Sequence, residues 1–581
     1  MVLQTSIAES RKHAYRRLFK MAKTTVIVPS MGKITLLDSH YLASGGEAAV
    51  YAKDGIAYKI YHDPLKMIPA AKIRELSKLT PSNVLKPTEI LLNIKNVEIG
   101  YVMQYKKDVQ ALCRFFTKAF RTRNNITDGI IADIVQKIQD TVEQIHREGF
   151  LIVDLNEMNI MCSGDFKTPY FIDVDSYQTP SYKATAIMES IRDRRMTGKT
   201  FTDGSDWFSF AIIAFTMYIG IHPYQGSHPK YKPNEWVTRR MDDGVSAFDK
   251  DVSLPNACNP LSVIPPPHLA WMKDVFMKGV RTAPPSVTGK AALPVAKKYT
   301  YTHSAANFDV SFVREYPENI LSIFEFMGTE YAVSANTIYK YDKNLSVDIS
   351  GIRMELCESS DMTPVLCKLI GENLSFEAMN GALIGKLSAS KMMYRNGCIY
   401  SFYGGKLVEN SFVSLGNKTI HQTRIASSVS ELTTKMFDGV VFEDLLGKCF
   451  VTIPYGAGLC STINISELNG YRIMEAKSLS NICVVLAEHN GKYHRVVIDF
   501  DKNYLKYDFR KTSDVPYSGI NFAVLNNGIC VLATESGVEI FKGQQVKVIT
   551  NPPFDSSTPL YNKSGSIHFI DGNKVYMCKA K

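Results

Sequence analysis

The chain has 581 residues, 45% of them apolar and 21% charged, which is too long for one hydrophobic core and predicts roughly three or four domain-sized units of a globular protein. The net charge of +10 is small for this length, so it permits acidic partners but does not indicate specific nucleic-acid binding. The eleven cysteines include no C-x-x-C pair, which argues against a zinc site or a disulfide framework. Together with the lack of a secretory signal, this predicts a cytoplasmic protein. The longest apolar run, 208–221, is too short to span a bilayer, so it is predicted to be a buried helix and no membrane span is expected.

Residues 1–34 are predicted to form a basic extension, with arginines and lysines on both sides of Met21. One interpretation is an amphipathic tether to an anionic surface. The other is a flexible tail, or an upstream start for which Met21 is the natural one, and this is the interpretation that we favour.

A strand, a small-residue turn and a second strand are expected over residues 41–53. Gly45 and Gly46 in the turn would let backbone N–H groups approach phosphate oxygens. The next strand, 56–61, carries Lys59 among apolar neighbours. A lysine below such a turn can hold phosphate groups as a point charge, although it could also be an edge-strand lysine that discourages aggregation.

Apolar residues at helical spacing predict a helix over residues 71–79. Glu75 on this helix could turn toward Lys59 and hold it extended. Alternatively it is a solvated glutamate, and the sequence leaves both interpretations open.

The most informative feature of the chain is a set of an acid, an amide and a second acid. Asp154 and Asn159 lie five residues apart, and Asp173 follows fourteen residues later in the next hydrophobic strand. The first acid can orient or deprotonate a hydroxyl, whereas the amide oxygen and the second acid can hold Mg²⁺, which prefers oxygen ligands. Taken alone, Asp154 and Asn159 could equally be turn residues.

Residues 35–290, about half of the chain, resemble a eukaryotic-type protein kinase. Several motifs carry the resemblance in the expected order: the glycine-rich loop at 43–50, the V-A-I-K-like strand ending at Lys59, the catalytic-loop-like stretch 152–159, the D-F-G-like stretch 173–175, a C-lobe helix starting near Asp206, and a closing segment at 279–284. The chain is most similar to a divergent group of bacterial and phage kinase-like proteins, in which the kinase domain is often fused to a second module.

The resemblance implies a kinase N-lobe over 35–106, a C-lobe over 107–286, and ATP and Mg²⁺ as cofactors. The residues it implies are the base Asp154; the phosphate-binding Lys59, held by Glu75; Gly45, Gly46 and Val50 over the phosphates; Ala57, Met103, Gln104 and Tyr105 around the adenine; Asn159 and Asp173 as metal ligands; and Asp206 and Arg281 as structural residues.

The motifs also depart from the typical kinase pattern. Ala43 and Ala48 stand at two glycine positions of the loop, Asn156 stands for the usual lysine, and Asp175 stands for the glycine of D-F-G. No A-P-E-like sequence is convincing, which puts the usual substrate platform in doubt. The phosphate-binding lysine, the base and both metal ligands are nevertheless present, so activity is expected.

A Lys/Ala/Thr-rich linker is expected over 287–307, after which the sequence changes character. From 308 to 581, short apolar strands alternate with Gly, Asn and Asp turns. The recurring unit predicts about six or seven repeats of roughly 40 residues, a period that fits a β-propeller. A pair of β-sandwiches is the alternative.

The sequence therefore predicts a multidomain protein, with an α+β bilobal kinase-like domain followed by an all-β domain. The expected function is ATP- and Mg-dependent transfer of the γ-phosphoryl group to Ser or Thr hydroxyls of a partner protein that the propeller recruits. Two alternatives stay open: a pseudokinase scaffold acting through nucleotide binding and propeller-mediated interactions, and a kinase-fold enzyme that modifies a small molecule or transfers AMP. The sequence does not indicate an oligomeric state.

Overall fold

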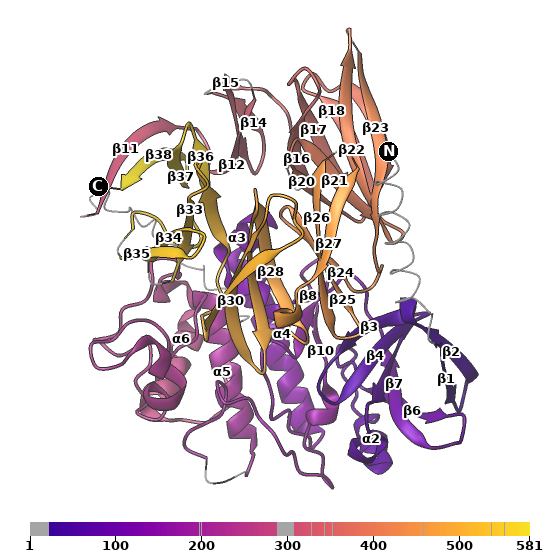
Figure 1. Cartoon of the computed structure of the whole chain (residues 1–581). Coiled ribbons are helices and arrows are strands. Elements are labelled where there is room, and N and C mark those ends of the chain that lie inside the picture. The colour runs from indigo at the N-terminus through magenta and orange to yellow at the C-terminus, as the bar shows by residue number, and fades with distance from the viewer. Residues whose placement is uncertain are drawn as a thin grey trace.

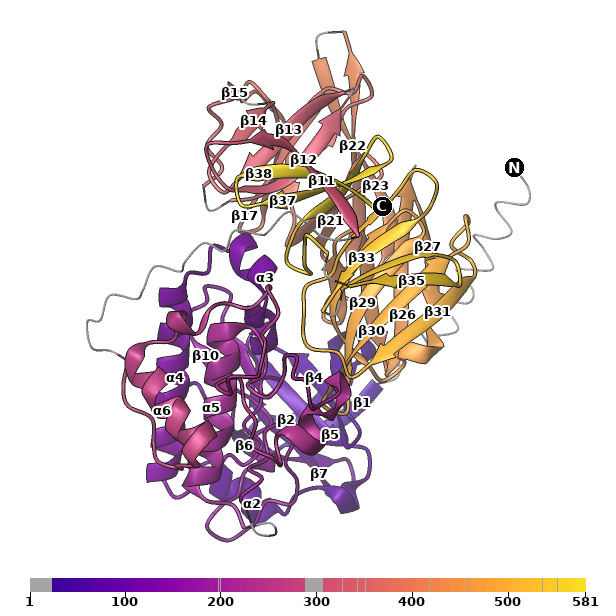
Figure 2. The ribbon, with the colours of Figure 1, turned by 90° about the vertical axis from the view of Figure 1, so that its left-hand side faces the viewer.

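Antiparallel sheets make up most of the chain, and nearly all helices lie in its first half. The structure is a computed structural model that describes residues 23–287, except 197 and 199, and residues 307–580, except 327, 342, 351, 417, 457, 536 and 551. The predicted extension up to residue 22 and most of the predicted linker lie outside these residues. Figures 1 and 2 show the first half, indigo to magenta, beside the sheets of the second half, orange to yellow.

The first half opens with a seven-stranded antiparallel sheet in the order β2-β1-β6-β7-β5-β4-β3. Its strands are β1 Lys23–Val28, β2 Gly32–Leu37, β3 Tyr41–Ser44, β4 Ala48–Lys53, β5 Ile56–Tyr61, β6 Pro87–Asn93 and β7 Glu98–Gln104. The tight turn between β4 and β5 places Asp54 and Gly55 at φ of 51° and 78°, a conformation that an Asp-Gly turn favours. Helix α2, Ala70–Leu76, follows β5 and packs on β6, close to the predicted helix over 71–79.

The remainder of the first half is largely helical. Its other elements are β8 Gln110–Ala111, α3 Lys118–Arg123, α4 Asp128–Arg147, β9 Ile160–Cys162, β10 Pro169–Phe171, α5 Asp203–Ile219 and α6 Pro266–Lys273, with the short turns η3 Leu112–Phe116 and η4 Val174–Ser176. Helices α4 and α5 pack together in the largest hydrophobic core. Thr127 and Thr202 begin them as side-chain N-caps. Helix α5 covers most of the apolar run that was predicted to be a buried helix, and no helix in the described residues is both long and apolar enough to cross a membrane.

The second half contains seven four-stranded antiparallel sheets within its described residues. Six of them follow one another along the chain over 320–344, 353–388, 391–428, 434–464, 472–513 and 521–549. Their first strands are β12 Ile320–Phe326, β16 Arg353–Glu358, β20 Lys391–Arg395, β24 Thr434–Phe437, β28 Arg472–Leu479 and β32 Asn521–Val524. The seventh sheet joins β36 Leu560–Lys563, β37 Ser566–Asp571 and β38 Lys574–Ala580 to β11 Phe308–Glu315, so the first and last strands of this half pair with each other.

Neighbouring sheets of the second half touch mainly through their first strands. Strand β16 contacts β20, and the same contact recurs from β20 to β24, β24 to β28, β28 to β32 and β32 to β36. Strand β12 contacts β37 of the seventh sheet. The first strands therefore contact one another in series from β16 to β36, and Figure 1 shows β16, β20, β24 and β28 in this region.

The two halves of the chain share a hydrophobic core. Met474, Leu486 and Tyr517 of the second half belong to the same cluster as the side chains of α4 and α5. A hydrogen bond from the Tyr493 hydroxyl to Glu157 Oε1, 2.9 Å long, adds a polar contact at this junction.

Candidate functional site

Lys59 on β5 lies between two aspartates that follow β10. Its Nζ is 2.9 Å from Asp173 Oδ1 and 2.8 Å from Asp175 Oδ2. The Tyr61 hydroxyl donates to Asp175 Oδ2 at 2.7 Å, and Lys72 Nζ on α2 donates to the main-chain oxygen of Asp175 at 2.7 Å. We call these five residues the Lys59 cluster.

The two aspartates of the Lys59 cluster differ in exposure, at 46% for the Asp173 side chain and 6% for that of Asp175. Burial alone would lower the pKa of Lys59, but Asp175 and Asp173 outweigh it and raise that pKa above the usual lysine value. Burial raises the pKa of Asp173. Burial acts in the same direction on Asp175, but Lys59 and the hydroxyl of Tyr61 hold the pKa of Asp175 below its usual value. Asp175 is therefore the buried counter-ion of Lys59, and Asp173 is the carboxylate that a cation from solvent can reach.

The structure also brings Asp154, Asn159 and Asp173 together. Asn159 Nδ2 donates to the main-chain oxygen of Asp154 at 3.0 Å and to its Oδ2 at 3.2 Å. Strands β9 and β10 pair antiparallel, which folds the chain back so that Ile172 N donates to Asn159 O at 2.9 Å, next to Asp173. The spacing of five and then fourteen residues thus corresponds to a loop followed by a hairpin.

A buried aspartate holds the loop that carries Asp154. Asp206 on α5 is fully buried; its Oδ1 accepts from Val153 N and its Oδ2 from Ile152 N, both at 2.8 Å. Val153 has a φ of 65°, which is strained for a β-branched residue. The two bonds to Asp206 hold this strained loop in place.

Arg281 ties the segment after the D-F-G-like stretch to the core. It forms a two-point ion pair with Asp193, with distances of 2.6 Å from Nε to Oδ2 and 2.8 Å from the guanidinium to Oδ1. Its guanidinium also lies 4.4 Å from the ring centre of Phe208 on α5. Arg281 therefore has a structural position.

Gly45 and Gly46 form the turn between β3 and β4. Neither has a positive φ, and a Cβ at either position would meet no atom within 4 Å. Backbone strain and packing therefore do not require glycine here. The N–H of Gly45 already donates to Ala48 O at 2.9 Å, so the open approach that glycine gives concerns the backbone at Gly46. His62 was not predicted from the sequence, but it closes the base of the turn. Its Nε2 lies 3.1 Å from both Ser44 Oγ and Gly45 O.

The residues expected around an adenine are neighbours on β5 and β7. Ala57 stands opposite Met103 in the β5–β7 ladder, and Gln104 follows at the end of β7. Tyr105 comes next, and its N–H donates to Gly55 O at 3.0 Å. Val50 on β4 stands opposite Lys59, so it lies between the glycine turn and the Lys59 cluster.

The expected pairing of Glu75 with Lys59 is wrong. Hydrogen bonds from Ser181 and Thr179 lower the pKa of Glu75, so its carboxylate faces a different segment. Helix α2 turns its Lys72 side toward the Lys59 cluster, and Asp175 supplies the carboxylate that was expected from the helix. The sequence contained one signal for this exchange, because Asp175 introduces a second acid where glycine was expected.

The segment around Met188 also binds the Asp154 carboxylate. Met188 N donates to Asp154 Oδ1 at 2.8 Å. The Met188 side chain packs against Gly491 in the turn between β29 Ile482–His489 and β30 Lys492–Phe500, because a Cβ on Gly491 would lie 3.1 Å from Met188 Cε. A turn of the second half thus supports the segment that covers this carboxylate.

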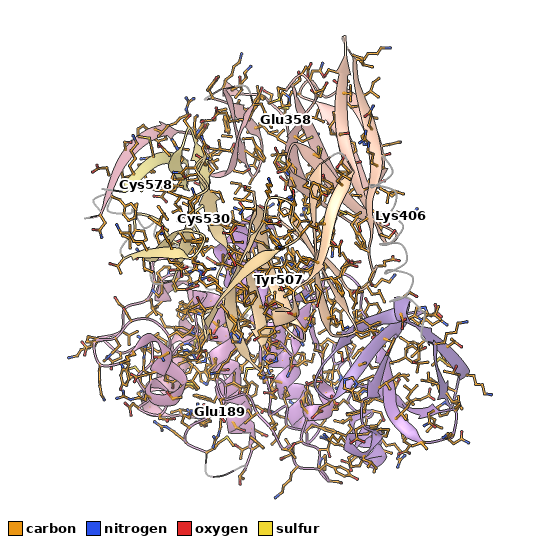
Figure 3. All side chains as sticks on the ribbon, viewed as in Figure 1. Glu189, Glu358, Lys406, Tyr507, Cys530 and Cys578 are labelled. Atoms are coloured by element: carbon orange, nitrogen blue, oxygen red, sulfur yellow. The ribbon has the colours of Figure 1, made fainter. Side chains whose placement is uncertain are left out.

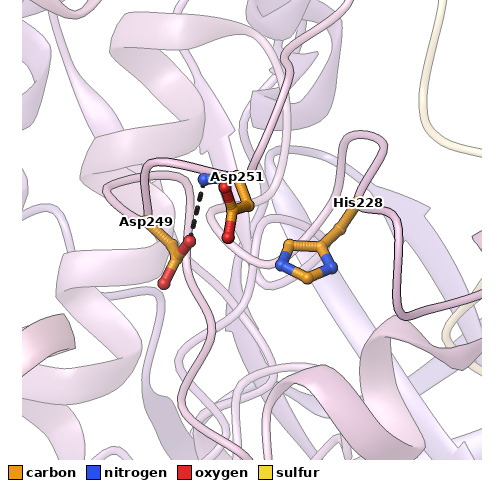
Figure 4. A group of neighbouring side chains, drawn as sticks. All are labelled: His228, Asp249 and Asp251. Carbon is orange, nitrogen blue, oxygen red and sulfur yellow. Dashed lines mark hydrogen bonds between the residues drawn. The ribbon is translucent and has the colours of Figure 1, made fainter.

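Another group of possible metal ligands contains His228, Asp249 and Asp251, whose ligand atoms lie within 4.8 Å of one another (Figure 4). Local backbone bonds already use two of them. Lys230 N donates to His228 Nδ1 at 3.0 Å, and Asp251 N donates to Asp249 Oδ1 at 2.9 Å. Such turn bonds are sufficient to explain the grouping.

The charges around Lys59 favour a divalent cation as part of any phosphate complex. The carboxylates of Asp173 and Asp175 offset the charges of Lys59 and Lys72, so the Lys59 cluster has no net positive charge to attract a triphosphate alone. Asp173 and the Asn159 amide oxygen offer the oxygen ligands that Mg²⁺ prefers, so the donor set fits this ion. Neither models of known protein families nor curated protein sequences match this chain.

Proposed function

We propose that residues 35–286 form a divergent protein-kinase-like domain that transfers the γ-phosphoryl group of ATP to a Ser or Thr hydroxyl of a partner protein. The observation that carries this proposal is the meeting of Lys59, Asp173 and the Asp154–Asn159 pair, which come from separate stretches of the chain. The strand order β3-β4-β5-β7-β6, with α2 between β5 and β6 in sequence and a helical part after β7, supports a bilobal arrangement.

Each residue has a role in the proposed reaction. The N–H groups near Gly45 and Gly46 cover the phosphates, and Lys59 contacts them while Asp175 keeps it in place. Asn159 and Asp173 would hold Mg²⁺, which supplies positive charge to the triphosphate.

Asp154 accepts the proton of the acceptor hydroxyl as the oxygen–phosphorus bond forms and the bond from the γ-phosphorus to the leaving ADP oxygen breaks. Ala57, Met103, Gln104 and Tyr105 line the adenine side.

For the second half, we propose a seven-bladed β-propeller that recruits the partner. Support comes from the contacts between first strands of consecutive sheets and from the pairing of β11 with β38, which joins the two ends of this half. Two β-sandwiches would instead require sheets that pack face to face in pairs.

A nucleotide-binding scaffold is the second candidate, and one observation favours it. Met188 N–H already occupies Asp154 Oδ1, so the candidate base is engaged within the chain. A scaffold would bind ATP without transferring phosphate.

The test is incubation of the full chain with Mg-ATP and myelin basic protein, with intact mass as the readout. We expect a phosphate-sized gain that falls by about 10²–10⁴-fold in Asp154→Ala, the range for loss of a general base. The gain should be lost in Asp173→Ala and kept in Asp165→Ala, a matched control in the turn between β9 and β10.

Undiminished transfer by Asp154→Ala would contradict the assigned base. ATP stabilisation without any mass gain would favour the scaffold. A gain of AMP size would assign the site to nucleotidyl transfer.

A further inference from the structure

Charged side chains gather where the first strands of the second half face α3 and η3. Two ion pairs join the halves there: Arg114 Nε lies 2.8 Å from Glu475 Oε1, and an Arg123 guanidinium nitrogen lies 3.5 Å from Asp438 Oδ2. Figure 1 shows α3 behind the middle of the sheets. The residues of this group, which we call the inner cluster, are Arg114, Arg123, Arg353, Glu355, Lys391, Lys435, Asp438, Glu475 and Lys477.

Cations outnumber acids in the inner cluster. After the two ion pairs, four cations are left, one on each of four first strands: Arg353 on β16, Lys391 on β20, Lys435 on β24 and Lys477 on β28. Among the described residues none of these four has a carboxylate within 4.0 Å. Glu355 is the one acid of the cluster outside these two ion pairs, although Asp438 also acts on Lys477 and Arg353, and Asp108 acts on Lys391.

The hydrogen bonds of these cations go to neutral groups. Arg353 donates to Met392 O and Lys435 Nζ to Ile473 O, both at 2.8 Å. Lys477 Nζ lies 5.6 Å from the ring centre of Phe522. A carbonyl or an aromatic ring orients a cation but does not cancel its charge.

The electrostatics agree with this surplus. The surrounding protein lowers the pKa of Lys435 to about 8, and the positive charges of Arg472, Arg114 and Lys391 act in the same direction. Water nevertheless reaches the Lys435 side chain. Burial and neighbouring cations also lower the pKa of Lys391. Burial raises the pKa of Glu355 to about 7, so at neutral pH this acid balances only part of the excess. A side chain that water reaches, yet that protein surrounds, suits a ligand-binding position.

We propose that the inner cluster binds a small anion with several phosphate charges, held by Arg353, Lys391, Lys435 and Lys477 at the junction of the two halves. Lysine and arginine are suited to phosphate oxygens, and the surplus of charge requires a ligand with more than one negative charge. Because η3 and α3 cover one side of the inner cluster, a compact ligand fits better than an extended polymer. The site is independent of the Lys59 cluster and does not rest on kinase activity.

The test is isothermal titration of the full chain with inorganic triphosphate in a magnesium-free buffer of low ionic strength. Without a divalent cation the Lys59 cluster has no net positive charge to attract the probe, because two carboxylates offset its two lysines. We expect Lys391→Met/Lys435→Met to weaken binding about a hundredfold, or about tenfold for each charge removed. The matched control is Lys406→Met/Lys448→Met, which removes two exposed lysines of the same half; Figure 3 shows Lys406 at the outer edge of the sheets.

Binding that is absent from the wild-type chain, or equal in the wild type and in Lys391→Met/Lys435→Met, would overturn the proposal. So would binding that is lost in Lys59→Met and kept in Lys391→Met/Lys435→Met, because the probe would then occupy the Lys59 cluster. Equal thermal stability of the two double variants would show that the loss of binding does not come from misfolding.

Discussion

The Lys59 cluster and the inner cluster are built from the same kinds of side chain, yet their charge balance differs. Around Lys59, two lysines meet two carboxylates, and Lys59 is paired with the buried acid Asp175. In the inner cluster, six cations face three carboxylates, two of which are already used in ion pairs. The two proposed roles, a metal site at the Lys59 cluster and an anion site at the inner cluster, rest on this balance and not on the residue types.

Substitutions of the two aspartates beside Lys59 should have the largest effects on stability. Asp175→Asn leaves the buried Lys59 without its main counter-ion, so the free energy of unfolding should fall by about 3–5 kcal/mol in urea denaturation. Asp173→Asn removes a half-exposed partner and should cost about 1 kcal/mol or less, while abolishing Mg-dependent phosphotransfer. Equal losses of stability in the two variants would contradict the division into a buried counter-ion and a metal ligand.

The inner cluster should respond in the opposite way to loss of a carboxylate. Asp438→Asn removes a negative charge that faces the proposed anion, so triphosphate should bind about tenfold more tightly in titration calorimetry. The free energy of unfolding should fall by only about 1 kcal/mol, because the ion pair with Arg123 is half-exposed.

Asp361→Asn is the matched control for this substitution, because Asp361 is an exposed acid in the turn after β16. Its triphosphate affinity should be unchanged. Weaker binding in Asp438→Asn than in this control would mean that the acid helps to hold the ligand.

The smallest effect concerns the pH dependence of stability. The pKa of Lys435 is about 8 in the folded chain and near 10.4 when unfolded, so between these values the unfolded state binds more protons. Stability should therefore rise with pH from about 8 to about 10.4. Because water screens this exposed side chain, the gain is at most about 1 kcal/mol.

Lys435→Met should lack this rise in urea denaturation performed across the same pH range. Lys406→Met serves as the control and should keep it. If the free energy of unfolding depends on pH identically in the wild type and in Lys435→Met, Lys435 does not feel the positive charges of the inner cluster.

Local sequence signals were sufficient for much of the fold. The strands expected over 41–53 and 56–61 correspond to β3, β4 and β5, the apolar run after residue 207 predicted the buried part of α5, and the spacing of short strands predicted about six or seven repeats. The spacing of Asp154, Asn159 and Asp173 predicted that the three would meet, because one hairpin between neighbouring strands is enough to bring them together.

Partners that depend on tertiary packing were not predictable in this way. The rotation of a seven-residue helix decided that Lys72, and not Glu75, faces Lys59. The inner cluster draws its cations from four strands and from η3 and α3, which lie more than 200 residues earlier in the chain. The repeat period predicts where such strands occur in the sequence, but it does not predict which of their side chains lie close together in the folded chain.

The contact of Met188 with Asp154 has a consequence for the order of events in the proposed reaction. An acceptor hydroxyl reaches Asp154 Oδ1 only by exchanging places with the N–H of Met188, an intramolecular competitor at high effective concentration. The segment is seated on the turn at Gly491, so the resting rate depends on how firmly the second half holds that turn. A partner that shifts the turn would speed the reaction without touching a single reacting atom.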